Sequence, residues 1–206
     1  SAEAYGESAR QPGPLEETRP LLPVTPYGAS KAAGEVLAAQ YGAKHGLDIV
    51  RIRPFGHTGP RQAPQFVCSD FARQIVEIQN GLRQPVIRVG NLEVRRDMSD
   101  VRDIVEGYWF ALEKGPPGEV YNVCSERIYS LREILDLLIQ QMGLHVEVVT
   151  EDGRLRQQDL TVLVGNCHRF RSLAGWQPRI PLEKTLADLL AYWREQEVPE
   201  EARARG

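Results

Sequence analysis

The sequence has few of the features that mark secreted, metal-binding or membrane proteins. Its 206 residues include 3 cysteines, Cys68, Cys124 and Cys167, which are widely spaced and form no C-x-x-C pair. Neither a disulfide framework nor a zinc site is therefore indicated. No apolar run reaches about 18 residues and no signal-peptide pattern opens the chain, which argues against membrane insertion and secretion. We expect reduced thiols, no metal site and a cytoplasmic location.

The chain also lacks a strong excess of either charge. A formal net charge of -3 and a pI of about 5.9 argue against nucleic acid or a membrane surface as a general partner. With 42% hydrophobic and 26% charged residues, the composition is that of a soluble globular protein of one domain or a little more.

What the sequence does contain is a helix-start signal followed by a tyrosine and a lysine one turn apart. Thr25 is a suitable N-cap and Pro26 fits the first helical position, so Tyr27 and Lys31 fall at i and i+4 on one helix face. A phenol in water has a pKa of about 10, and a nearby cation favours its phenolate. Lys31 can be that cation, which suits Tyr27 to proton transfer. The alternative is an ordinary surface pair worth a few tenths of a kcal/mol.

The periodicity of apolar residues predicts alternating helices and strands, as a parallel α/β sheet requires. We expect helices over residues 27–45, 66–80, 100–114, 130–142, 166–175 and 182–195, and strands over 47–52, 86–89, 120–123 and 146–149. Residues 9–25 read as an irregular loop and residues 200–206 as a polar tail. Asn166 is the expected cap of the short helix, and Trp109 is assigned to the core.

Several stretches together carry a family resemblance. They are Ser1 to Gly6 (SAEAYG), Tyr27 to Lys31, Arg53 to Pro60 (RPFGHTGP), Arg95 to Asp103, Tyr121 to Val123, Arg154 to Arg156 and Gly175 to Pro178. This combination resembles the extended short-chain dehydrogenase/reductases that act on nucleotide-sugars, from Ser1 to about Arg194. The resemblance implies a catalytic triad of Ser1, Tyr27 and Lys31. In related dehydratases an acid and base pair occupies the positions of Ala2 and Glu3. Ala2 cannot perform proton chemistry, which favours a reductase, and Glu3 is a fourth candidate catalytic residue.

The resemblance also implies ligand contacts. Cofactor-binding residues would be Tyr27, Lys31, Pro54, Phe55 and His57, with the backbone of Pro54 and Phe55 near the nicotinamide carboxamide. Substrate-binding residues would be Gly56, Asn91, Arg96, Arg156 and Asp159. Gly56 stands where the family usually has an asparagine that meets the substrate pyrophosphate. Arg96 would face the nucleotide, Arg156 a phosphate and Asp159 the ribose hydroxyls.

For the fold, the resemblance implies an α/β protein: the C-terminal part of a doubly wound Rossmann-type parallel sheet plus a smaller α/β substrate-binding lobe. Residues 1–120, with later returns, would belong to the former and residues 121–206 mainly to the latter. No Gly-x-x-Gly-x-x-Gly cluster occurs in the chain, although backbone must approach a dinucleotide pyrophosphate closely. We expect the N-terminal dinucleotide-binding βαβ units to be missing and the chain to be the C-terminal portion of a longer enzyme.

For function, the segments at 70–76, 89–93 and 120–125 are similar to the subgroup that reduces GDP-4-keto-6-deoxyhexoses. The resemblance implies NADPH or NADH as hydride donor, a GDP-sugar as substrate, and a homodimer formed through the helix that starts near Tyr27. We expect the chain by itself to be inactive. Two alternatives stay open: a nucleotide-sugar 4,6-dehydratase or 4-epimerase, and a non-catalytic fragment that binds a nucleotide-sugar or pairs with another subunit.

Overall fold

The computed structural model describes residues 1–154 and 160–196. The chain divides into two compact units, each assembled from three separate stretches. Unit 1 comprises Ser1–His57, Val94–Tyr129 and Gln157–Arg179, and unit 2 comprises Thr58–Glu93, Ser130–Arg156 and Ile180–Gly206. These units are defined by packing alone, so the assignment of residues 1–120 and 121–206 to a catalytic part and a substrate-binding lobe stays a prediction.

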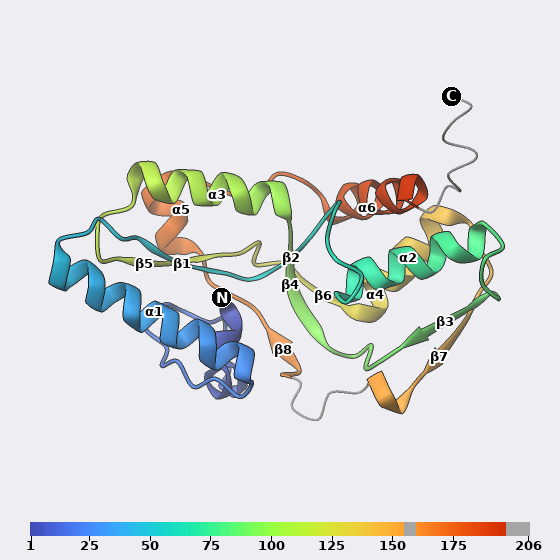
Figure 1. The fold of residues 1–206 in the computed structure, drawn as a ribbon, viewed down its shortest axis with the longest axis horizontal. Helices are drawn as coiled ribbons and strands as arrows, with labels where there is room; N and C mark the ends of the chain where they lie inside the picture. Colours follow the sequence, from blue (N-terminus) through green and yellow to red (C-terminus); the bar gives the residue numbers. More distant parts are fainter. Residues whose placement is uncertain (155–159, 197–206) are drawn as a thin grey trace. The chain divides into compact units, whose positions relative to one another are not determined.

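Unit 1 is built around a pair of parallel strands with helices on both sides. Strand β1 (Arg51–Pro54) pairs with β5 (Val120–Val123) in parallel. Helix α1 (Pro26–His45) contacts β1 from one side, while α3 (Val101–Lys114) and α5 (His168–Ala174) lie on the other (Figure 1). This is the layering of a parallel α/β fold, and it confirms the predicted fold class.

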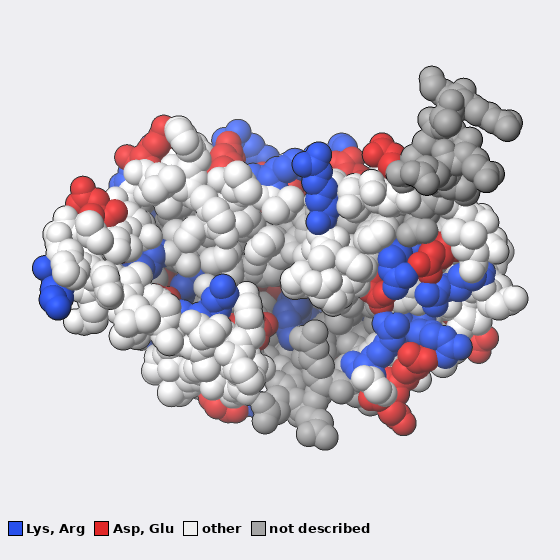
Figure 2. All heavy atoms as spheres, in the orientation of Figure 1, with Lys and Arg blue, Asp and Glu red and all other residues white. Residues whose placement is uncertain are grey.

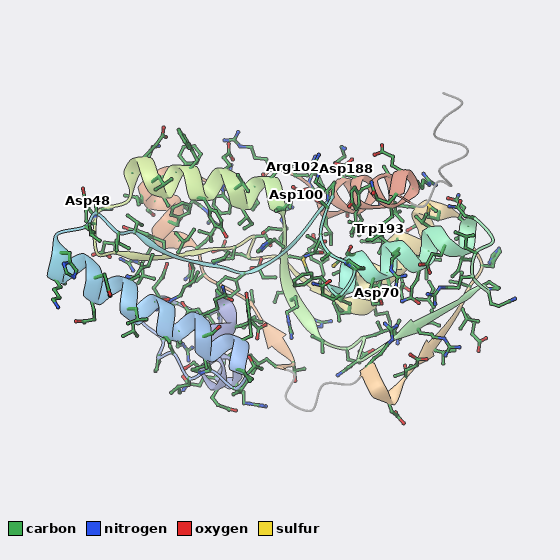
Figure 3. The ribbon with its side chains drawn as sticks, in the orientation of Figure 1. Asp48, Asp70, Asp100, Arg102, Asp188 and Trp193 are labelled. Atoms are coloured by element: carbon green, nitrogen blue, oxygen red, sulfur yellow. The ribbon has the colours of Figure 1, made fainter. Side chains whose placement is uncertain are left out.

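The helix boundaries follow the local signals in the sequence. The Thr25 hydroxyl accepts a hydrogen bond from the Gly28 amide at 3.0 Å, and α1 ends at Gly46, whose φ of 65° is left-handed. Asp100 caps α3 by accepting from the Arg102 amide, and the Arg102 guanidinium returns to the same carboxylate; Figure 3 labels this pair at the start of the helix. These caps confirm the predicted starts of α1 and α3.

Six further elements, which lie wholly or mostly in unit 1, were not predicted from the sequence. They are the 3-10 turns η1 (Ala2–Tyr5) and η2 (Glu7–Arg10) and the strands β2 (Gly56–Thr58), β4 (Arg95–Asp100), β6 (Ile128–Ser130) and β8 (Val162–Leu163). Strand β4 lies between β2 and β6, and β8 pairs with it in parallel. The buried side chains of β4 include the polar residues Asp97, Ser99 and Asp100. The sequence of β4 therefore lacks the alternation of apolar and polar residues that predicts a strand.

Aromatic side chains form the centre of the unit 1 core. The Phe170 ring lies 5.8 Å from the Tyr121 ring and 5.6 Å from the Trp176 ring. Trp176 is fully buried, and its indole N–H donates to the Asp103 carbonyl at 3.0 Å. Burying each such side chain contributes about 1.5 to 3 kcal/mol, and the indole hydrogen bond removes the cost of an unsatisfied donor.

Unit 2 is a helical cluster beside a second parallel strand pair. Helices α2 (Val67–Gln79), α4 (Leu131–Met142) and α6 (Leu182–Gln196) contact one another. Strands β3 (Val86–Val89) and β7 (Glu147–Thr150) pair in parallel, and the short turn η3 (Asp152–Arg154) follows. The apolar faces of these helices supply the core of unit 2: Phe71, Ile75, Ile134, Leu138, Leu186 and Leu189.

Unit 2 contains a capped helix start and several ion pairs. The capping box predicted at the start of α4 is present, because Ser130 accepts from the Glu133 amide and Glu133 accepts from the Ser130 amide. Ion pairs join basic and acidic side chains of this unit, including Arg154 with Asp70 at 2.7 Å and with Glu151 at 3.1 Å. Figure 2 shows basic and acidic atoms next to one another on the face that it draws. Within residues 1–154 and 160–196, no helix is long and apolar enough to cross a membrane.

Three sequence-based expectations need correction. The strand expected over residues 47–52 begins only at Arg51, because the Leu47 amide still bonds back to Gly42 and the chain is turning there; Leu47 is 50% exposed. Trp109 is 61% exposed rather than in the core, since α3 buries the face that carries Ile104 and Ala111. Cys167, not Asn166, is the N-cap of α5, although the Asn166 side chain accepts from the His168 amide.

Asp97 is a fully buried carboxylate that fixes the turn after β5. It accepts hydrogen bonds from the Ser125 amide at 2.8 Å, the Ser125 hydroxyl at 2.7 Å and the Glu126 amide at 2.8 Å. Burial raises the pKa of Asp97 from 3.8 to about 6, although these hydrogen bonds act in the opposite direction. The folded protein therefore holds this proton more tightly than the unfolded chain does.

This raised pKa predicts that Asp97 makes the free energy of unfolding fall as the pH rises from about 4 to about 6. The stabilisation from protonated Asp97 is complete below the pKa that this carboxyl has in the unfolded chain, and it is lost as the pH rises through its pKa in the folded protein. A difference of about two pKa units between the two states corresponds to about 3 kcal/mol. We expect Asp97→Asn to remove this decline, as measured by urea unfolding between pH 4 and pH 7.

Asp48→Asn is the matched control, because Asp48 is an exposed carboxylate (Figure 3). Subtracting each variant's curve from that of the unmodified chain cancels the titration of all other groups. A curve for Asp97→Asn parallel to that of the unmodified chain would contradict the prediction.

Candidate functional site

The predicted tyrosine and lysine lie on the same face of α1. The Lys31 ammonium is 5.3 Å from the centre of the Tyr27 ring. The Tyr27 side chain is 56% exposed, and Lys31 is exposed beside it. A phenol next to an ammonium, both open to solvent, is an arrangement that can donate or accept a proton at a bound ligand.

Gly28 brings the N-terminal turn against this part of α1. Ser1 precedes η1, and its hydroxyl oxygen accepts from the Glu3 amide at 3.4 Å. A Cβ atom at residue 28 would lie 2.6 Å from the Glu3 carbonyl oxygen, so only glycine permits the approach. The structure thus packs the turn that contains Glu3 and follows Ser1 against the start of α1, the helix that carries Tyr27 and Lys31.

The buried guanidinium of Arg53 connects the same two elements. It donates to both carboxylate oxygens of Glu35, at 2.9 and 2.6 Å, and Glu35 lies one helical turn beyond Lys31. A further nitrogen donates to the Tyr5 hydroxyl at 2.7 Å and to the Glu17 carbonyl at 3.0 Å. Tyr5 is the last residue of η1, so Arg53 holds the helix of Lys31 and the turn of Ser1 in fixed register.

The electrostatics of this network keep Arg53 charged. Burial by itself lowers the pKa of Arg53, but the hydrogen bonds to Glu35 and Tyr5 outweigh burial and hold that pKa above its ordinary value. The Tyr5 hydroxyl in turn donates to Asn122 of β5 at 2.7 Å. Sequence reasoning missed this network, because its members are far apart in the chain; the one available signal was that Arg53 and Asn122 both fall in family-like segments.

The residues after β1 are the ones that we expected to face the cofactor, and that role stays a prediction. Phe55 is buried with its ring 6.3 Å from the Tyr5 ring, and the His57 Nδ1 atom lies 2.9 Å from the Phe55 carbonyl oxygen. A Cβ at Gly56 would lie 2.4 Å from the Asp97 carbonyl oxygen. The close approach of β2 to β4 therefore excludes the asparagine that the family usually has at Gly56.

The structure describes only some of the residues that we expected to contact the substrate. The Arg96 guanidinium in unit 1 donates to the Leu160 carbonyl at 2.7 Å and to the Arg95 carbonyl at 2.9 Å. In unit 2 the Asn91 side chain accepts from the Glu93 amide at 2.9 Å. Arg156 and Asp159 lie outside the described residues. The binding roles of all four stay predictions.

Across the described ranges, no group of three or more His, Cys, Asp or Glu residues is arranged to hold a metal ion.

An α/β unit that places an exposed Tyr-x-x-x-Lys pair beside a serine turn has the organisation of a short-chain dehydrogenase/reductase of the epimerase/dehydratase type. The chain belongs to the GDP-mannose 4,6-dehydratase family, whose sequence model matches residues 1–189. This confirms the resemblance on which the site was assigned and makes the chain a member of a family of nucleotide-sugar-modifying enzymes.

Individual relatives support the same placement. GDP-6-deoxy-D-mannose reductase from Pseudomonas aeruginosa is 35% identical over 201 residues, which cover 98% of this chain and 66% of the relative. GDP-mannose 4,6 dehydratase 1 from Arabidopsis thaliana is 31% identical over 188 residues, covering 89% of this chain and 50% of the relative. A solved structure of RMD from Pseudomonas aeruginosa complexed with NADPH superimposes with a TM-score of 0.90 at 34% identity, covering 95% and 65% of the two chains. The chain thus spans about half to two thirds of the length of these relatives.

Two glycines of α1 provide a test of how the site is assembled. We expect Gly28→Ala to lower the free energy of unfolding by about 1 to 3 kcal/mol, since its Cβ would overlap the Glu3 carbonyl. Gly34→Ala in the same helix meets nothing within 4 Å and should instead raise stability by up to about 1 kcal/mol. Urea unfolding measures both, and equal effects of the two substitutions would show that α1 does not depend on contact with η1.

Proposed function

We propose that this chain is the part of an NADPH- or NADH-dependent reductase that acts on the 4-keto group of a GDP-4-keto-6-deoxyhexose, in GDP-deoxysugar biosynthesis. The observation that carries the proposal is the exposed pair of Tyr27 and Lys31 on α1, a helix that packs through Gly28 against the turn that follows Ser1. The identity of 35% to GDP-6-deoxy-D-mannose reductase supports this reaction over others of the family.

The residues present suit one end of the nicotinamide cofactor. Tyr27 and Lys31 are exposed to solvent and can meet the nicotinamide ribose. The Phe55 ring lies 6.3 Å from the ring of Tyr5, the last residue of the turn that follows Ser1. NADPH in the Pseudomonas structure supports the choice of cofactor. The sequence has no Gly-x-x-Gly-x-x-Gly turn for the pyrophosphate, so we assign that contact to a part of the enzyme outside this sequence. When bound, the cofactor supplies hydride.

We assign the proton transfer to residues of this chain. Tyr27 would donate its hydroxyl proton to the sugar oxygen that gains negative charge, and the Lys31 ammonium would stabilise the phenolate left behind. Ser1 accepts from the Glu3 amide through its oxygen, so its own O–H can donate to the same sugar oxygen. Each contribution is stronger toward the charged oxygen than toward the ketone, as transition-state stabilisation requires.

The second candidate is a 4,6-dehydratase, which the family itself and the Arabidopsis relative favour. Water elimination needs an acid and a base at the substrate. Ala2 supplies neither at the position where related dehydratases carry one of the pair. We therefore rank the reductase first.

Substrate recognition and assembly complete the proposal. We assign Arg96, Arg156, Asp159 and Asn91 to the GDP moiety, and residues 121–206 mainly to the lobe that holds it. Pairing of two copies through α1 is supported by the exposed apolar side chains Val36 at 58%, Leu37 at 60% and Tyr41 at 57%. Three free thiols in the structure fit the reducing cytoplasm.

The proposed role of Tyr27 predicts the behaviour of Tyr27→Phe in a full-length version of the enzyme. We expect kcat for oxidation of NADPH with GDP-4-keto-6-deoxymannose to fall by about 10² to 10⁴, with KM little changed, measured by absorbance at 340 nm. Tyr41→Phe, at a second exposed tyrosine of α1, should keep full activity.

Different outcomes separate the candidates. Conversion of GDP-mannose to a 4-keto product, without oxidation of NADPH by the 4-keto substrate, would establish the dehydratase instead. Full activity of Tyr27→Phe with the 4-keto substrate would overturn the assignment of Tyr27 as proton donor.

A further inference from the structure

Arg53 holds a carboxylate that lies one helical turn from Lys31. Both oxygens of Glu35 accept hydrogen bonds from the Arg53 guanidinium, at 2.9 and 2.6 Å, and the side chains of Glu35 and Arg53 are only 11% and 6% exposed. Glu35 follows Lys31 by four residues in α1. Side chains at this spacing are neighbours on a helix surface, where a lysine and a glutamate can form an ion pair. In this protein the carboxylate is paired with Arg53 instead.

The ammonium of Lys31 is next to a phenol rather than a carboxylate. It lies 5.3 Å from the centre of the Tyr27 ring, and no carboxylate within residues 1–154 and 160–196 forms an ion pair with it. A cation stabilises a nearby phenolate less when an anion pairs with that cation. At this distance in water, one unit charge changes the titration of a phenol by about half a pH unit.

A second guanidinium near Glu35 makes a weaker contact. Arg51 lies 3.8 Å from the same carboxylate, which is too far for a hydrogen bond. Without Arg53, the Glu35 carboxylate would keep only this contact in a nearly buried position. Burying a charge without hydrogen bonds is unfavourable, and rotation of Glu35 toward the exposed Lys31 ammonium would remove that cost.

We propose that Arg53 is a positioning residue for the proton transfer: it holds the Glu35 carboxylate away from Lys31, so that the ammonium stays available to Tyr27. This inference rests on the proposed reductase function. Because the Arg53 side chain is buried, we assign it no contact with substrate or cofactor. It acts by preventing an ion pair between two residues of one helix.

Cross-linking tests this arrangement of charges on the chain as it stands. A water-soluble carbodiimide joins an amine to a carboxylate where the two are in contact, and mass spectrometry identifies the joined peptide. We expect no link between Lys31 and Glu35 in the unmodified chain and a clear link in Arg53→Met. Lys184 and Asp188, which form an ion pair with the same spacing in α6, should be linked in both chains as the internal control.

Arg51→Met is the matched control variant, because it removes the more distant guanidinium and leaves Arg53 in place. We expect it to give no link between Lys31 and Glu35. Two outcomes would overturn the proposal. They are a link of equal yield in the unmodified chain and in Arg53→Met, and no link in Arg53→Met while the control pair in α6 reacts.

Kinetics of a full-length version of the enzyme show whether the arrangement matters for the reaction. We expect Arg53→Met to lower kcat for the reduction by about tenfold. The alkaline limb of its pH profile should rise by about half a pH unit, because a phenol whose neighbouring cation is neutralised is a weaker acid. Adding Glu35→Gln removes the competing carboxylate and should restore both values. Loss of packing alone would neither move this limb nor be repaired by a second substitution.

Glu35→Gln by itself separates the effect of charge from that of packing. It breaks the same ion pair but leaves no carboxylate free, so kcat should stay within about threefold of the unmodified enzyme and the alkaline limb should not rise. A tenfold loss would overturn the proposal, even where circular dichroism shows that Arg53→Met does not fold. Absence of reductase activity in the unmodified enzyme would instead refute the proposed function, and the cross-links would still decide whether Arg53 keeps Glu35 from Lys31.

Discussion

The buried guanidinium of Arg53 is the interaction on which the arrangement of unit 1 depends. It donates to Glu35 in α1, to Tyr5 at the end of η1 and to the Glu17 carbonyl. Leaving a buried charge without partners costs several kcal/mol, so these elements must stay where the guanidinium can reach them. Because Lys31 is in α1 and Ser1 precedes η1, the same constraint sets the geometry of the candidate catalytic residues.

Close contact between backbone segments is the second constraint, and it explains why two positions are occupied by glycine. Gly28 lets α1 approach the Glu3 carbonyl, and Gly56 lets β2 approach the Asp97 carbonyl. The first contact brings the turn that follows Ser1 to the helix of Tyr27. The second leaves no room for the asparagine that the family resemblance led us to expect at residue 56. If the reductase proposal holds, the chain must bind the substrate pyrophosphate through other groups than the side chain at residue 56.

The sequence predicted best where the signal acts within one or two turns of chain. Thr25, Gly46, Ser130 and Glu133 cap helices through bonds to residues three or four positions away, so their effect does not depend on the rest of the fold. Prediction failed where burial decides. The helical pattern of α3 indicated that the face bearing Trp109 would be covered, but a pattern does not show what covers it, and that side chain is exposed.

The sequence by itself determined the helix limits, the α/β class and the placement of Tyr27 and Lys31 on one face, because helical spacing converts four positions along the chain into one direction in space. Only the tertiary structure decided that the turn of Glu3 packs against α1 at Gly28 and that Arg53 joins Glu35 to Tyr5. These contacts join residues far apart in the chain. Their distances are set by how closely packed elements can approach, which no local pattern of residues encodes.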